Sequence, residues 1–283
     1  MPVQEIFKSI YLIITFLFLL GFIFNFFKKF LLARIVMSMG SILCFLCIIL
    51  LIIIEKRIPL FGSFESTVYI IFLVSIIEII SKNFIETAFY KNRISLIMCI
   101  AFFIILLLQK NSPKIFNNDF FMYGNLWVNI FFNLRLVGAA FFIYAAIIAN
   151  AVMWTNLNIN LSDINQSNIN SLSINSNMPS QNNCNSNNIN IKFIKNNAIH
   201  MARNFLLIGV AIYLVSEWAG SLWCLNWLGD SWRWTKDFFK ASIVFLFVML
   251  CFHIPVSFKY SSKIKLPAMS FPAMFIIWMI LFH

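Results

Sequence analysis

The chain has 283 residues, of which 61% are apolar and only 11% are charged, with a net charge of +11 and a mean hydropathy of +0.87. Soluble domains carry about 25% charged residues, so this composition excludes a soluble enzyme. The 34 phenylalanines exclude a chain that is disordered over most of its length. Because the basic residues fall between apolar runs, the charge favours a membrane topology signal and anionic lipid over nucleic acid as a partner.

Eight apolar runs predict membrane-spanning helices, since such a helix needs about 20 apolar residues. In chain order the runs are residues 6–27, 30–54, 67–81, 94–108, 126–153, 203–218, 238–254 and 267–282. The short runs need local thinning of the bilayer or help from flanking residues. The predicted fold is therefore all-α, a polytopic transmembrane helical bundle of about eight spans.

The segment between the fifth and sixth runs has a different composition. Residues 156–197 are rich in Asn and Ser. Such a segment has too little apolar area to build a core, and we expect a disordered inner loop. The chain then divides into spans one to five (1–154), this loop (155–200) and spans six to eight with a tryptophan-rich loop (201–283).

Basic residues in the connections predict the orientation of the spans, because Lys and Arg are in excess on the inner side of a membrane. If the connection between the sixth and seventh spans faces outside, twelve basic residues lie inside and eight outside. The inner set is Lys28, Lys29, Arg34, Lys82, Lys91, Arg93, Lys192, Lys195, Arg203, Lys259, Lys263 and Lys265. The outer set is Lys8, Lys56, Arg57, Lys110, Lys114, Arg233, Lys236 and Lys240. Both termini would then face outside.

Tryptophans gather in the connection after the sixth span. Five of the eight lie there: Trp218, Trp223, Trp227, Trp232 and Trp234. An aromatic belt is one interpretation, although a belt spreads its rings over many helix ends. The other interpretation is a platform on which flat indoles stack against a large planar ligand such as a porphyrin. Composition and spacing leave both open.

The tryptophan pattern resembles the WWD motif of the CcsA/ResC branch of the haem-handling cytochrome c assembly family. Trp223, Gly229, Trp232 and Trp234 fall at the motif's spacing, and Trp227 is one place away from it. Thr235 stands where the family has aspartate.

Further segments fit the same order. Residues 59–66, which include Glu65, resemble an outer loop of that family, and the weaker match at residues 126–138 resembles the start of its fifth span. The resemblance implies cytochrome c biogenesis. Haem would be a substrate presented on the outer face for covalent attachment to apocytochrome c, with a second membrane subunit as partner. It also implies a bacterial plasma membrane or an organellar membrane, and no nucleic-acid partner.

Histidines are the axial ligands that the resemblance calls for. The chain has three, and His253 matches a family histidine near the inner end of a span. Phe131 stands where the family has one outer histidine, and His283 at the chain end is the candidate for the other. The departures keep a second hypothesis open, a structural membrane subunit that no longer binds haem.

Glu78, Arg135 and Glu217 lie within or at the ends of the predicted spans, where charges are costly and are expected to be paired or functional. For Arg135 and Glu217, one hypothesis is an ion pair between them, and the other is that Arg135 reaches a haem propionate. Glu78 lies near the inner end of its span, from which its side chain can extend to the membrane interface. A transporter is disfavoured, because no inverted repeat or pair of broken spans is visible. The motifs of soluble catalytic sites are also missing from the sequence.

Overall fold

The computed structural model describes residues 2–56, 58–60, 62–81, 88–109, 124–172, 182–229, 236–254 and 261–281. Within these ranges the chain is α-helical apart from short turns and helix ends, and no strand occurs there. The helices are α1 (Pro2–Phe26), α2 (Phe30–Glu55), α3 (Ser63–Ser81), α4 (Ala88–Leu108), α5 (Leu126–Leu172), α6 (Asn182–Leu228), α7 (Lys236–His253), α8 (Ser261–Ala268) and α9 (Phe271–Leu281). The all-α prediction is confirmed for the described chain.

Six of these helices are long and apolar enough to cross a membrane. They cover Glu5–Phe26, Phe30–Ile54, Ser63–Ser81, Lys91–Leu108, Leu126–Trp154 and Asn197–Trp227. A helix crosses hydrocarbon readily because all its backbone N–H and C=O groups are hydrogen-bonded within the helix itself. The chain is therefore an integral membrane protein, with the first six predicted spans in place.

The last two predicted spans correspond to shorter apolar helices than the first six. The apolar parts of the final three helices cover only Phe239–His253 and Ile264–Ile280. The second of these is broken, because α8 ends at Ala268 and a turn at Met269 and Ser270 precedes α9. Pro272 sits at the second position of α9, where a missing N–H costs nothing and the fixed φ suits a helix start.

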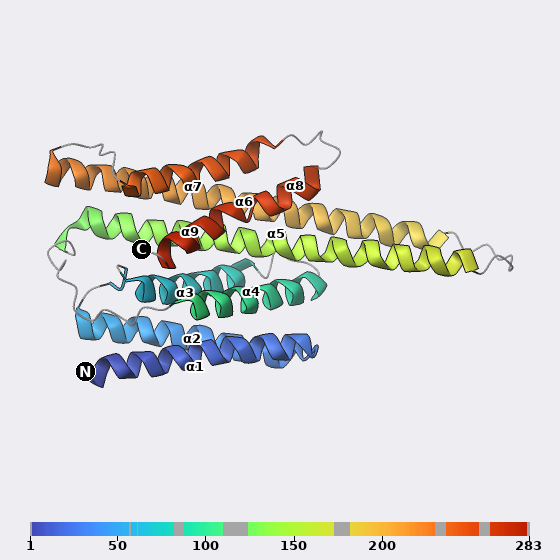
Figure 1. Ribbon diagram of the computed structural model, residues 1–283, viewed down its shortest axis with the longest axis horizontal. Helices are drawn as coiled ribbons and strands as arrows, with labels where there is room; N and C mark the ends of the chain where they lie inside the picture. The colour runs from blue at the N-terminus through green and yellow to red at the C-terminus, as the bar shows by residue number, and fades with distance from the viewer. Residues whose placement is uncertain are drawn as a thin grey trace.

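Residues 155–200, for which a disordered inner loop was predicted, include parts of two long helices. The structure continues α5 to Leu172 and begins α6 at Asn182. Extending an existing helix is far easier than starting one, and both helices grow out of stable apolar spans. Leu157, Leu161 and Ile164 also recur at helical spacing. Figure 1 shows this pair of helices projecting beyond the ends of the others.

The centre of the bundle is α5, which packs on α3, α4, α6, α8 and α9. In the most apolar 18-residue window of Leu126–Trp154, 78% of the residues are buried, against 22–56% in the corresponding windows of the other five long spans. Alanines supply much of its buried middle, including Ala139, Ala140 and Ala145. Small residues let neighbouring helices approach closely, which replaces the missing hydrophobic drive for association in lipid.

The long helices run side by side along one direction, so the bundle has two ends (Figure 1). The tryptophan end carries the start of α1, the end of α6 and the end of α9. The lysine end carries the α1–α2 turn with Lys28 and Lys29, and the last residue of α7, His253. Both ends of the described chain thus lie at the same end, as the charge pattern predicts.

Candidate functional site at the tryptophan end

Close packing of α5 against α6 sets the geometry of the tryptophan end. Gly220 of α6 faces Phe131 of α5, where an added Cβ would lie only 2.8 Å from the phenyl ring. One turn earlier, Ser216 donates a hydrogen bond from Oγ to the carbonyl oxygen of Phe131 at 2.9 Å. Further along, Gly209 and Gly138 make similarly tight contacts between the two helices. Residues of α6 at this spacing therefore form a stripe that faces α5.

Trp223 and Trp227 continue that stripe at steps of three and four residues. Because the helices are antiparallel and α5 begins only at Leu126, this part of α6 passes the start of its partner. Trp227 is 54% exposed although it follows the bundle-facing stripe. The indole Nε1 of Trp223 is buried and finds no hydrogen-bond acceptor among the described residues. Buried polar groups normally have a partner, so this N–H is an unsatisfied donor among the described residues.

Residues 218–228 of the tryptophan-rich stretch, where a loop was predicted, belong to α6. The helix stops at Leu228 because Gly229 adopts φ +70°, a left-handed conformation that glycine enters at little cost. Its N–H donates to the carbonyl of Leu225 at 3.1 Å. Gly229 thus ends the helix, and nothing lies within 4 Å of where its Cβ would be. Trp232, Trp234 and His283 lie outside the described residues.

Trp218 does not join Trp223 and Trp227. Nine residues separate it from Trp227, which places the two on opposite sides of α6. Its ring packs edge-on against Trp127 of α5, with centroids 5.9 Å apart and planes at 84°. The described indoles near the end of α6 therefore fall into two sets, Trp127 with Trp218, and Trp223 with Trp227 on one side of α6.

Arg135 and Glu217 form the ion pair that was one of the two hypotheses for them. Nε of Arg135 lies 3.8 Å from Oε1 of Glu217, with the side chains 18% and 28% exposed. The guanidinium also donates to the hydroxyl of Tyr213 from Nε at 3.3 Å and from Nη2 at 3.2 Å. It lies over the rings of Phe131 and Tyr213, at 5.1 and 5.6 Å. Six residues separate Glu217 from Trp223, so the pair lies about 9 Å deeper along α6.

The described histidines do not lie at the tryptophan end. His253 is the last residue of α7 and is exposed, with Nδ1 2.8 Å from the carbonyl oxygen of Met249. His200 is exposed on α6, 23 residues before Trp223 or about 35 Å along the helix. The structure therefore separates the predicted ligand His253 from the predicted platform, as expected for a residue near the inner face.

Glu65 is not in an exposed outer loop as expected. It lies in the first turn of α3 and is only 1% exposed. A carboxylate in the first turn of a helix is stabilised by the positive end of the helix dipole. The neighbouring Ser66 donates from Oγ to the carbonyl of Leu60 at 3.0 Å, and Ser63 accepts from Gln109 at 2.8 Å. These bonds hold the α2–α3 connection against the bundle.

Sequence reasoning missed the stripe that positions the two indoles. Its signal was present as Gly209, Ser216 and Gly220 at steps of three to seven residues, leading into Trp223 and Trp227. The identity of the partner helix was not readable, since the contact joins segments about 85 residues apart, as between Phe131 and Ser216.

Comparison of the chain with protein-family models, with curated proteins and with solved structures found no match. Within the described residues, no group of three or more His, Cys, Asp or Glu side chains is arranged to hold a metal ion. The geometry of the tryptophan end and the motif resemblance are therefore the observations that bear on function.

Proposed function

We propose that this protein binds haem as a substrate at the tryptophan end and presents it for attachment to apocytochrome c. The observation that supports this most directly is that Trp223 and Trp227 lie on one side of α6 close to its end. Trp227 offers an exposed aromatic face, and Trp223 offers an N–H without an acceptor among the described residues. A flat macrocycle with polar groups at its edge satisfies both.

The work of these side chains would be binding and orientation, because the thioether bonds form between haem vinyl groups and cysteine thiols. Trp232 and Trp234 follow in the same motif and would extend the aromatic surface. Arg135 is the candidate partner of a propionate, since a guanidinium carries several donors that match carboxylate oxygens.

Two histidines would serve the iron at different stages. His253 at the lysine end suits haem uptake from the inner side, and its Nδ1 contact with Met249 orients the ring. His283 is the candidate ligand at the platform. A second membrane subunit would complete the assembly, in a bacterial plasma membrane or an organellar membrane.

A second candidate function is a structural membrane subunit without haem. Phe131 supports it, because this residue stands at the position of the family's outer histidine and its ring fills the space beside Gly220. Trp127 and Trp218 support it too, since their rings pack the two helices together. In this case Trp223 and Trp227 would contact a partner subunit.

A visible absorption spectrum of the protein purified from haem-producing cells separates the two functions. Haem binding predicts a Soret band that falls several-fold in Trp227→Ala and in Trp223→Phe, which keeps the ring but removes the N–H. Trp278→Ala is the matched control, because Trp278 is 50% exposed on α9. A band lost in His253→Ala would assign the ligand. Preparations without any Soret band would favour the structural subunit.

A further inference from the structure

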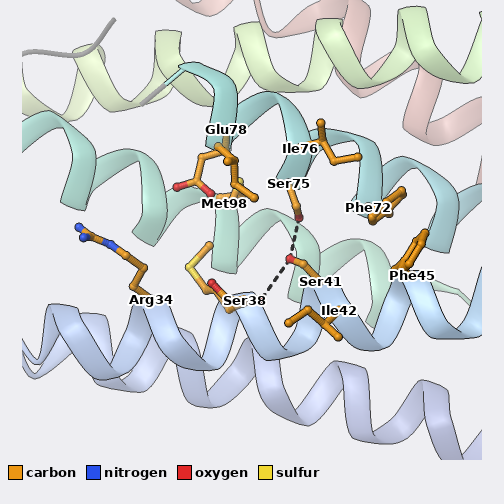
Figure 2. Close-up of a pocket in the computed structure, with 12 residues that line it drawn as sticks. Arg34, Ser38, Ser41, Ile42, Phe45, Phe72, Ser75, Ile76, Glu78 and Met98 are labelled. Carbon is orange, nitrogen blue, oxygen red and sulfur yellow. Dashed lines mark hydrogen bonds between the residues drawn. The ribbon is translucent and has the colours of Figure 1, made fainter. Parts of the chain in front are cut away.

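A cavity of about 290 Å³ opens between α2 and α3, far from the tryptophan pair along the bundle. Its walls change character along its length (Figure 2). Arg34, Ser38 and Glu78 line one end, and Phe45 and Phe72 line the other, where their rings stack with centroids 5.1 Å apart. A site that is charged at one end and aromatic at the other suits an amphiphile, which has a polar headgroup and an apolar tail.

The polar end lies at the lysine end of the bundle. Arg34 is in the second turn of α2, just after Lys28 and Lys29, and Glu78 is in the last turn of α3. They approach from two different helices, as Figure 2 shows. This level corresponds to the membrane interface, where a lipid headgroup lies. The apolar end then points along the span toward the bilayer centre.

The length of the cavity fits one leaflet. Eleven residues separate Arg34 from Phe45, which is about 16 Å of helix. The hydrocarbon core of a bilayer is about 30 Å thick, so the cavity spans about the depth of one acyl chain. Its mouth opens to lipid, because Ile42 and Ile79 are 59% and 60% exposed.

The serine hydroxyls in the floor of the cavity already have hydrogen-bond partners within the protein, so they do not require a polar ligand. Ser41 and Ser75 bond to each other at 2.9 Å, across the gap between α2 and α3. Each hydroxyl also bonds to a backbone carbonyl of its own helix, that of Met37 at 3.0 Å and that of Ile71 at 2.8 Å. Hydrocarbon lying over them leaves no hydroxyl unsatisfied.

From these observations we infer that the cavity between α2 and α3 binds a phosphatidylethanolamine molecule, with one acyl chain against Phe45 and Phe72. Arg34 would hold the phosphate, because a guanidinium matches two phosphate oxygens. Glu78 would accept hydrogen bonds from the ammonium group. A purely anionic headgroup would meet the Glu78 carboxylate as a like charge, so the pair of charges selects a zwitterionic lipid. This inference does not depend on haem binding.

Native mass spectrometry of the detergent-purified protein tests the inference with three dioleoyl lipids, phosphatidylethanolamine, phosphatidylcholine and phosphatidylglycerol. We expect phosphatidylethanolamine adducts at the lowest lipid concentration. Arg34→Gln and Glu78→Gln should each weaken them about tenfold, as expected for loss of one charged hydrogen bond. Lys29→Gln is the control, since it removes an exposed cation at the same membrane level but outside the cavity.

A tail variant gives an independent test. Ser41→Leu should fill the floor and reduce adducts of all three lipids, with helical content checked by circular dichroism. If this variant does not fold, the two headgroup variants still decide. Binding of phosphatidylglycerol equal to or tighter than phosphatidylethanolamine would overturn the inference, as would adducts unchanged in both headgroup variants. Absence of any retained lipid would also overturn it and point to a partner helix in the groove.

Discussion

Removing either Arg135 or Glu217 alone is expected to lower the free energy of unfolding by more than the intact ion pair contributes to it. The charged atoms lie 3.8 Å apart and both side chains are mostly buried. Two unit charges near 4 Å attract by about 4 kcal/mol at an effective dielectric constant of about 20. Desolvation of both groups opposes most of that attraction, so the intact pair contributes little net stability, whereas one unpaired buried charge costs about 3 kcal/mol.

The two single variants should differ. In Arg135→Gln the Glu217 carboxylate loses its cation, and we expect a loss near the full 3 kcal/mol. In Glu217→Gln the guanidinium keeps the Tyr213 hydroxyl and two aromatic rings, so we expect a loss of about 1–2 kcal/mol.

Unfolding in detergent micelles, followed by circular dichroism, measures these losses. The double variant Arg135→Gln/Glu217→Gln should be at least about 1 kcal/mol more stable than the sum of the single losses predicts, because contacting residues are not additive. Single losses that add within about 0.5 kcal/mol would refute the reasoning. They would show that the two charges do not interact in the folded protein.

The close approach of α5 and α6 predicts that Gly209→Ala destabilises the protein by about 1–3 kcal/mol, because the new methyl group would lie 2.9 Å from the ring of Phe142. Gly124→Ala is the control in the same unfolding assay, since nothing lies within 4 Å of its Cβ position. Equal losses of stability in the two variants would contradict the packing. Gly229→Ala should cost about 1 kcal/mol through its positive φ alone, so an unchanged midpoint would show that α6 does not end there. Reporters fused to the two termini should be accessible from one side of the membrane and a cysteine at Lys29 only from the other; termini on opposite sides would refute the bundle topology.

Much of the fold was predictable because run length and apolar content are strong signals. The six long spans follow from runs such as 30–54, whose helix ends within one residue of the prediction. Prediction and structure differ where the low helix propensity of a segment is outweighed by its continuity with a stable membrane-spanning helix. Residues 155–172 contain many poor helix formers, yet they extend α5. Residues 218–228 are helical because the first residue that ends α6 is Gly229, with its positive φ.

The candidate site was predictable only in part. Trp223 and Trp227 stand out by composition, but their separation from Trp218 follows only once α6 is known to continue as a helix through these residues. Glu65 was placed in an outer loop by the resemblance of residues 59–66 to a family loop, and the structure has it buried in the first turn of α3. The α2–α3 cavity had no sequence signal, since its serines and aromatics are separated by up to about forty positions.

The sequence by itself determined that this is a helical membrane protein, because a chain with so few charges has no other way to satisfy its backbone and surface together. Tertiary structure alone decided which side of each helix faces a neighbour. Phe142 is 1% exposed and Phe16 is 57% exposed, yet both occur in uniformly apolar runs. In water an apolar face marks the core, but in lipid both the core and the outer surface are apolar, so the pattern carries no such mark.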